Sequence, residues 1–193
     1  NGNGRIIHEM STNGAVFNLG NINETPQFVS LIWKMYQWTG DKEFLEKYYP
    51  TLTKGMDWLL TEKDENGNLF PDGFGMMEIH GMDSEMIDVA VYTQKALEDL
   101  NKIHFVLKGA NNAQYLEKAH ALKNKINSLF WNEEFKSYAD FIGSDEQALK
   151  LIEDAIVRAD TLQKPWAVTE LKQTKDFIIK NPSSRTLIIL AYY

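Results

Sequence analysis

Two pairs of helical segments, each joined by a short turn around a single glycine, constrain the fold more than any other feature of this sequence. Apolar side chains recur every three or four residues on both sides of Gly40 and again on both sides of Gly109, which is the period of an amphipathic helix. A glycine just after the last apolar position is a common helix end. The second helix of each pair must turn back on the first, so the sequence predicts an all-α fold of antiparallel helical hairpins.

Capping residues and prolines predict where the helices begin. Thr25 followed by Pro26 fits an N-cap with proline at the first helical position. Asp41 and Asp145 fit the N-caps of later helices, and Pro50 could kink or split the second one. Helices are expected near 26–39, 42–60, 84–108, 112–131, 145–157 and 165–179, with a further candidate at 186–193, while turns and short β-like segments are expected at 64–73 and 131–143.

The alternation of helix directions places the long loops of the chain together. A loop that precedes the first, third or fifth helix emerges at the same end of an antiparallel array. These three loops are rich in acidic, amide and histidine side chains, and they should form one polar face. The candidates on that face are His8, Glu9 and Glu24 before the first helix, Asp72, Glu78 and His80 before the third, and Tyr138 and Asp140 before the fifth.

Composition excludes several kinds of function. The formal net charge is −7, and the absence of a long Lys/Arg cluster argues against nucleic-acid binding. The chain has no cysteine, so disulfides and thiolate sites are impossible. No metal or phosphate-binding motif occurs, and we expect no cofactor. No apolar run approaches the roughly 20 residues of a membrane span.

The segment 70–94 holds the densest group of acids in the sequence. Asp72, Glu78, Asp83 and Glu85 lie within fourteen residues, directly before a strongly helical stretch. Like charges held close together are unfavourable unless they are solvated, paired or used in chemistry. Paired carboxylates are typical of acid and base catalysis, so this segment is the first candidate for an active site.

Two residues of this segment compete for the role of general acid. Glu78 is the first choice, because the apolar neighbours Met76, Met77 and Ile79 would desolvate its carboxyl and favour the protonated form. Asp72 is the second choice. Its alternative interpretation is strong, since an aspartate between proline and glycine is a common turn sequence.

Three segments of the chain resemble the six-hairpin glycosidases, particularly bacterial sequences labelled amylo-α-1,6-glucosidase or glycogen-debranching-like. They read GRIIHEMSTNGAVFNLGNINETPQFVSLIWKMYQWTGDKEFL, FPDGFGMMEIHGMDSEMIDVAVYTQKALEDL and FWNEEFKSYADF. The resemblance implies part of an (α/α)6 toroid, with short β-like loops and sugar binding at its mouth. It also implies hydrolysis by a pair of carboxylates, usually with inversion. Because such bacterial enzymes are often exported, a periplasmic or secreted location is favoured over a cytoplasmic one.

The chain is short for such a toroid. Six hairpins need about twelve helices, which at roughly twelve residues each plus loops exceeds 193 residues. We therefore expect residues 1–193 to form a single, incomplete toroid domain that is completed by the rest of its own polypeptide. In the family the second catalytic carboxylate usually comes from a late loop, so the resemblance places the general base beyond Tyr193.

The remaining loop residues are candidates for binding a sugar. Glu85 and Asp88 are expected on one face of the first turn of the third helix, where acids also complement the helix dipole without any function. A loop histidine is often only polar surface, and Glu24 could be a polar neighbour of the Thr25 cap. Aromatic rings stack on sugars while polar groups bind hydroxyls. The expected substrate-binding residues are His8, Glu9, Glu24, Phe74, His80, Asp83, Glu85, Tyr138 and Asp140.

The sequence thus predicts a glycoside hydrolase that acts on a neutral oligo- or polysaccharide through carboxylate catalysis. Two alternatives stay open. A sugar epimerase on the same toroid would need a pair of histidines, and the chain has four. A non-catalytic carbohydrate-binding toroid would use the acids only to bind hydroxyls.

Overall fold

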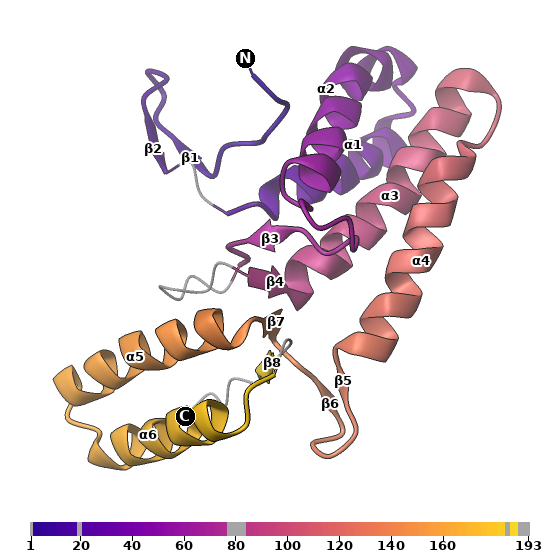
Figure 1. Cartoon of the computed structure of the whole chain (residues 1–193). Helices are drawn as coiled ribbons and strands as arrows, with labels where there is room; N and C mark the ends of the chain where they lie inside the picture. Colours follow the sequence, from indigo (N-terminus) through magenta and orange to yellow (C-terminus); the bar gives the residue numbers. More distant parts are fainter. Residues whose placement is uncertain (1, 19–20, 77–83, 184–185, 189–193) are drawn as a thin grey trace.

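Three antiparallel helical hairpins make up most of the structure, a computed structural model that describes residues 2–18, 21–76, 84–183 and 186–188 (Figure 1). This confirms the predicted all-α class and the hairpin pattern. The helices of the described chain are α1 (Glu24–Thr39), α2 (Lys42–Thr61), α3 (Ile87–Lys108), α4 (Ala113–Leu129), α5 (Asp145–Thr161) and α6 (Pro165–Lys180).

The glycine turns form as the sequence predicts. Gly40 has φ 67° and ends α1, and its N–H donates to the carbonyl of Tyr36. Gly109 has φ 75° and ends α3 with the equivalent bond to Phe105. A left-handed residue at this position reverses the chain while satisfying a free carbonyl of the last turn. Both turns lie at one end of the helices, which we call the turn end (Figure 1).

Some predicted helix starts are wrong. Asn23, rather than Thr25, precedes α1, because the Thr25 hydroxyl instead accepts the N–H of Ile6 at 3.1 Å. The α5 cap is Ser144 rather than Asp145, and it forms a reciprocal capping box with Gln147. Pro50 does not split α2, which runs unbroken through it. Residues 186–188 form a strand and not a helix.

A four-stranded antiparallel sheet connects the hairpins. Its order is β3-β4-β7-β8, so it joins the loops that precede α3 and α5. Because Ser84–Met86 pairs as the second strand, α3 begins only at Ile87. The strands of the described chain are β1 (Glu9–Met10), β2 (Val16–Asn18), β3 (Asp72–Gly73), β4 (Ser84–Met86), β5 (Trp131–Asn132), β6 (Ser137–Tyr138), β7 (Phe141–Gly143) and β8 (Thr186–Ile188).

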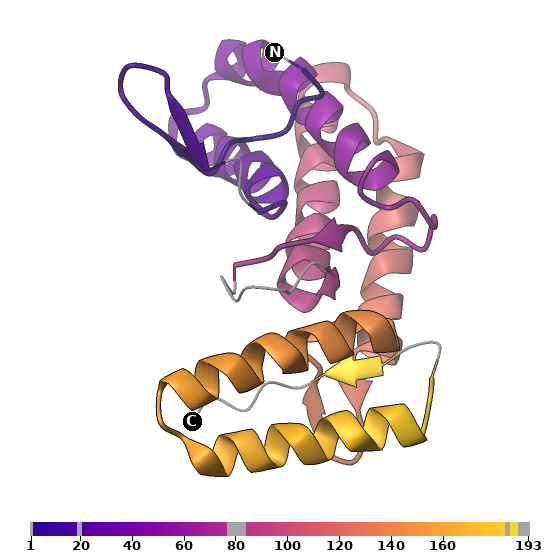
Figure 2. The same cartoon turned by 60° about the vertical axis from the view of Figure 1, so that its left-hand side comes forward.

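The main hydrophobic core lies among the first four helices and the sheet. Leu45 of α2, Leu97 and Leu100 of α3 and Leu122 of α4 are fully buried in it. The α5–α6 hairpin has a smaller cluster of its own around Ala148 and lies beside the sheet (Figure 2). No helix of the described residues is long and apolar enough to cross a membrane.

The predicted alternation places the long loops at one end. Strands β1 and β2, β3 and β4, and β7 lie where α1, α3 and α5 begin, opposite the glycine turns (Figures 1 and 2). We call this the loop end. The β5–β6 hairpin extends separately from the end of α4 (Figure 1).

Candidate active site

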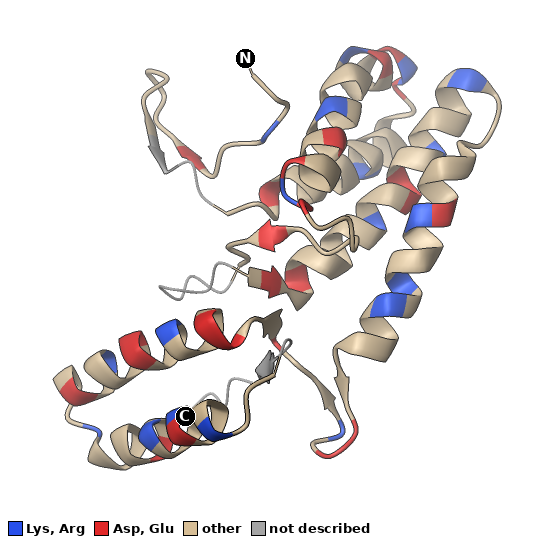
Figure 3. Cartoon of the chain, viewed as in Figure 1, with Lys and Arg blue, Asp and Glu red and all other residues tan. Residues whose placement is uncertain are grey.

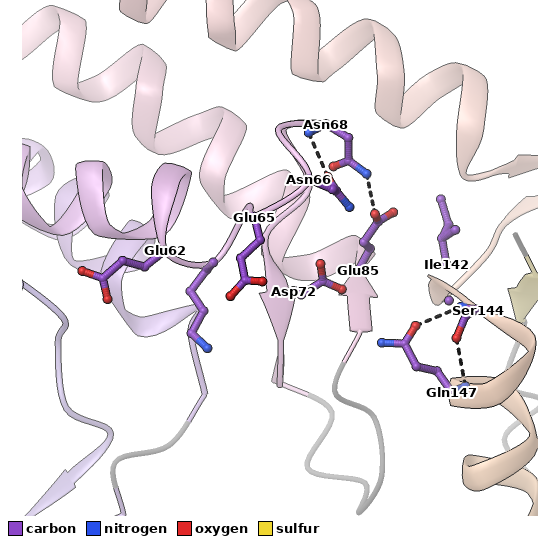
Figure 4. A pocket seen from close by; sticks show the side chains of 11 residues that line it. Glu62, Glu65, Asn66, Asn68, Asp72, Glu85, Ile142, Ser144 and Gln147 are labelled. Carbon is purple, nitrogen blue, oxygen red and sulfur yellow. Dashed lines mark hydrogen bonds between the residues drawn. The ribbon is translucent and has the colours of Figure 1, made fainter. Parts of the chain in front are cut away.

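A cavity of about 680 Å³ opens at the loop end, between the loop after α2, the sheet and the start of α5. Its wall carries four carboxylates and a single ammonium group, so we call it the acidic cavity. Figure 3 shows acidic positions on β3, on β4 and on the loop after α2. The polar residues that define the acidic cavity are Glu62, Lys63, Glu65, Asn66, Asn68, Asp72, Glu85, Ser144 and Gln147 (Figure 4).

Asp72 and Glu85 form the centre of this site. They are direct partners in the antiparallel pairing of β3 and β4, and directly opposed residues project from the same face of a sheet. Asp72 is half-buried and Glu85 is 8% exposed. The Asp72 N–H donates to the carbonyl of Lys63 at 2.6 Å, which anchors β3 to the loop after α2.

The structure changes the setting expected for Glu85. Glu85 lies in a strand and not in the first turn of α3, so it does not share a helix face with Asp88. The side-chain amide of Asn68 donates to Glu85 Oε1, and Lys125 Nζ of α4 donates to the Asn68 carbonyl at 2.7 Å. These contacts fix the carboxylate of Glu85 at the cavity wall.

A buried aspartate shapes the loop that supplies Asn68. Asp64 is 5% exposed, and its two carboxylate oxygens accept the N–H groups of Asn68 and Leu69, each at 2.9 Å. Leu69 has φ 74°, an uncommon conformation for a branched residue. The carboxylate of Asp64 therefore holds the turn that aims Asn68 at Glu85.

Part of the cavity wall was not predicted from the sequence. Glu62, Glu65, Asn66, Asn68 and Gln147 line it. The segment 64–73 was interpreted as turns and short β-like segments, and Asp72 was its only predicted site residue. The density of amides and acids in that segment was the available signal. Its pairing with the sheet was not visible, because it depends on contacts across the fold.

Three predicted site residues, Glu78, His80 and Asp83, lie outside the described residues. Phe74 precedes them and is 36% exposed. Its carbonyl accepts the N–H of Ile22 at 2.9 Å. This bond brings the start of α1 against the backbone that follows Asp72.

His8, Glu9 and Glu24 form a second polar group, at the start of α1. His8 Nδ1 lies 2.5 Å from Glu24 Oε1, and its Nε2 lies 3.9 Å from Glu9 Oε1. The side chain of Glu24 is 16% exposed, whereas that of Glu9 is 60% exposed. Glu24 is thus the partner of a histidine, and not merely a neighbour of a helix cap. None of the three lines the acidic cavity.

Tyr138 and Asp140 are placed differently from the other candidates. The Tyr138 hydroxyl donates to Asn127 of α4 at 2.7 Å, and its ring meets Trp131 with centroids 5.1 Å apart. Tyr138 therefore lies on the β5–β6 hairpin, away from the acidic cavity. The Asp140 carbonyl accepts the N–H of Ile87 at 3.0 Å, which connects the segment before β7 to the start of α3.

The described histidines lie in different environments. His8 contacts Glu24, whereas His104 Nδ1 lies 2.6 Å from the Tyr49 hydroxyl at the turn end. His120 on α4 is exposed beside Asn124. Among the described residues, no two histidines face each other as a proton-transferring pair would.

The tyrosine that contacts His104 is itself perturbed. Burial is the main cause that raises the pKa of Tyr49 and that of Tyr115 next to it.

Comparisons with known proteins identify the family of this chain. The profile of the bacterial alpha-L-rhamnosidase 6 hairpin glycosidase domain matches residues 20–175. Among solved structures, a GH78 family rhamnosidase of Bacillus sp. GL1 aligns with 84% of this chain, at a TM-score of 0.53 and 17% sequence identity. The chain spans only 17% of that rhamnosidase chain. A search of curated proteins found no match.

These comparisons refine the resemblance seen in the sequence. The family profile supports the six-hairpin glycosidase superfamily. Neither names an amylo-α-1,6-glucosidase, which was the member that the sequence segments resembled. At 17% identity the structural likeness supports the fold alone.

Proposed function

We propose that this chain, which belongs to the bacterial alpha-L-rhamnosidase six-hairpin glycosidase domain family, is the part of a glycoside hydrolase that donates the proton to the glycosidic oxygen. The observation that carries the proposal is the placement of Asp72 opposite Glu85 at the wall of the acidic cavity. Glycosidases of the common type use two carboxyl groups that flank the scissile bond. A cavity of this size is also typical of small-ligand sites.

The roles of the two described carboxylates differ in this proposal. Glu85 is fixed by Asn68 and is therefore suited to accept a hydroxyl of the sugar. Asp72, at the edge of the sheet, is the described candidate for the general acid. Glu78, the first choice from the sequence, competes for that role from outside the described residues. His8, Glu9 and Glu24 would bind the sugar at the start of α1.

The charge of the cavity supports a neutral substrate. Glu62, Glu65, Asp72 and Glu85 are opposed by Lys63 alone within the lining. A sugar that carries a carboxylate or sulfate would be repelled by this wall. The amides of Asn66 and Asn68 can bind hydroxyls without charge.

The proposed reaction is hydrolysis with inversion. The general acid protonates the leaving oxygen while a second carboxylate activates water on the opposite face of the sugar. The two carboxyl groups of such a pair are about 6.5–9.5 Å apart, whereas about 5 Å indicates retention. The family name makes aryl α-L-rhamnosides the first substrates to test, and α-1,6-linked glucosides follow because of the sequence resemblance.

The test compares Asp72→Asn and Glu78→Gln with the wild type in the natural full-length protein. Exposed Glu117→Gln on α4 is the matched control. Loss of the general acid should abolish hydrolysis of a glycoside with a poor leaving group and spare one with an activated leaving group, which needs no protonation. An aryl uronide should be hydrolysed much more slowly than the neutral glycoside.

Two results would contradict the proposal. If both acid variants retained wild-type rates on the poor leaving group, the proton donor would lie elsewhere. If the protein bound oligosaccharides but left every glycoside intact after prolonged incubation, it would be a carbohydrate-binding domain and not a hydrolase.

A further inference from the structure

The backbone that follows Asp72 is held by two side chains of α3. Asp88 Oδ2 accepts the N–H of Met76 at 2.5 Å, and the Tyr92 hydroxyl lies 3.0 Å from the sulfur of Met76. Asp88 and Tyr92 are four residues apart, so they lie on one face of the helix. One turn of α3 thus binds both the backbone and the side chain of the same residue.

Gly75 fits so closely against the same carboxylate that a side chain at this position would force the carboxylate of Asp88 to shift. A Cβ atom added at Gly75 would lie 2.6 Å from Asp88 Oδ2 and 2.8 Å from its Cγ, distances that real Cβ atoms essentially never show. The absence of a side chain at Gly75 is therefore what lets the carboxylate of Asp88 reach the N–H of Met76.

Other contacts hold the rest of this short segment. A Cβ atom at Gly73 would lie 2.9 Å from the side chain of Ile22, and Ile22 also donates its N–H to the carbonyl of Phe74. On the other side, Asp72 is anchored to Lys63. Every residue from Asp72 to Met76 is therefore held by a contact, and Asp88 of α3 supplies those at Gly75 and Met76.

Stability alone does not explain this use of Asp88. An acid in the first turn of a helix complements the dipole even when it stays exposed. Here Asp88 Oδ1 is buried and has no hydrogen-bond partner among the described residues, an arrangement that is unfavourable for a carboxylate. The position of this carboxylate is better explained by its contacts with Gly75 and Met76 than by its contribution to stability.

We infer that Asp88 is a positioning residue, which acts through Gly75 and Met76 to set the place of Asp72 in the acidic cavity. The inference rests on the proposed function, because it assigns Asp88 to the same site. Asp88 itself does not line the cavity, so its effect on a reaction would be indirect. A misplacement of about 1 Å can lower a catalysed rate by as much as about 100-fold.

The test uses Asp88→Ala, Asp88→Asn and a control, Asp176→Asn on the exposed face of α6, in the natural full-length protein. Asp88→Ala should lower kcat on a glycoside with a poor leaving group by about 10- to 100-fold, with KM within about threefold of the wild type. Asp88→Asn keeps an acceptor oxygen and should recover part of the loss. The control should leave kcat unchanged.

Gly75→Ala supplies a second, independent variant. Its methyl group should clash with Asp88 and lower kcat in the wild-type background. In the Asp88→Ala background the clash is gone, so the same change should have little further effect. This non-additivity would show that the two residues act through one contact.

Amide hydrogen exchange measures the positioning without any catalysis. In Asp88→Ala the N–H groups of Asp72 and Met76 should exchange faster than in the wild type, while amides of the turn end should not change. Unchanged exchange at Asp72, or a wild-type kcat in a variant with faster exchange there, would overturn the inference. If the wild type hydrolysed no glycoside but Asp72 still lost protection in the variant, the proposed function would fail while the positioning role held.

Discussion

The two ends of the helical hairpins use their polar side chains in opposite ways. At the turn end, Asn101 is 6% exposed, and its amide donates to Asn111 while its oxygen accepts the N–H of Asn112 at 2.8 Å. At the loop end, Asp72 and Glu85 meet across two strands, beside two further acids and one lysine. Complementary partners stabilise the fold at the turn end. The like charges at the loop end lack such partners in number, and the proposed function assigns them to binding and catalysis.

The largest stability effect is expected from Asp64→Ala, which would remove the residue that shapes the loop end. Two N–H groups lose a charged acceptor, and such bonds are worth about 1.5–3 kcal/mol each. The free energy of unfolding should fall by about 3–6 kcal/mol, and kcat should fall because Asn68 no longer holds Glu85. Urea unfolding and a hydrolysis assay would measure both. A loss of stability with wild-type kcat would separate this loop from the site.

Asn101→Ala, at the turn end, should lower the stability of the fold without lowering kcat. The N–H of Asn112 and the side chain of Asn111 would each lose a partner, which costs about 1–3 kcal/mol in total. Because the acidic cavity lies at the other end of the helices, kcat should stay within about twofold of the wild type. Thermal unfolding and kinetics on the same preparation would check this. A large fall in kcat without a change in stability would contradict the division between the ends.

Gly109→Ala gives a smaller effect at the turn end. Nothing lies within 4 Å of an added Cβ atom there, so the substitution tests the left-handed conformation alone. The penalty for a side chain at this φ is about 1–2 kcal/mol. Gly2→Ala is the matched control, since its surroundings are equally open and its φ is not positive. Equal stability of both variants would show that the turn accepts a side chain without strain.

The smallest expected effect concerns pH. Burial raises the pKa of Tyr115 above its value in the unfolded chain, and the neighbouring Tyr49 raises it further. The folded state therefore holds this proton longer than the unfolded state does. The corresponding stability is fully present below pH about 10, where a free tyrosine titrates, and it is lost as pH rises above that value. Tyr115→Phe should flatten this alkaline loss in urea titrations, and an unchanged slope above pH 10 would contradict the assignment.

The same contrast explains what could be predicted from the sequence. Gly40, Gly109 and the helical period are local signals, so the hairpins and the turn end were predicted correctly. The loop end depends on contacts that are distant in sequence. Glu85 was placed in a helix because its neighbours look helical, whereas pairing with β3 and β7 makes it part of a strand. Asn68 was missed because its role rests on Glu85, seventeen residues away.

The second polar group at the loop end shows the same limit. His8 and Glu24 were both chosen from the sequence, but their contact joins residues sixteen positions apart. The alternation of helices predicted that they would share an end of the molecule with Asp72. It could not predict that His8 and Glu24 pair with each other, nor that Tyr138 lies on a separate hairpin with Asn127.

The most direct measurement of the central claim is to record kcat and Tm together for Asp72→Asn and Asn101→Ala on a neutral glycoside with a poor leaving group. We expect each variant to change a different quantity. Asp72→Asn should lower kcat by about 10²–10⁴-fold, as expected for loss of a general acid, with little change in Tm. Asn101→Ala should lower Tm by several degrees and leave kcat nearly unchanged. If Asp72→Asn retained wild-type hydrolysis, or if both variants changed kcat and Tm in parallel, the loop end would not be the catalytic end of this fold.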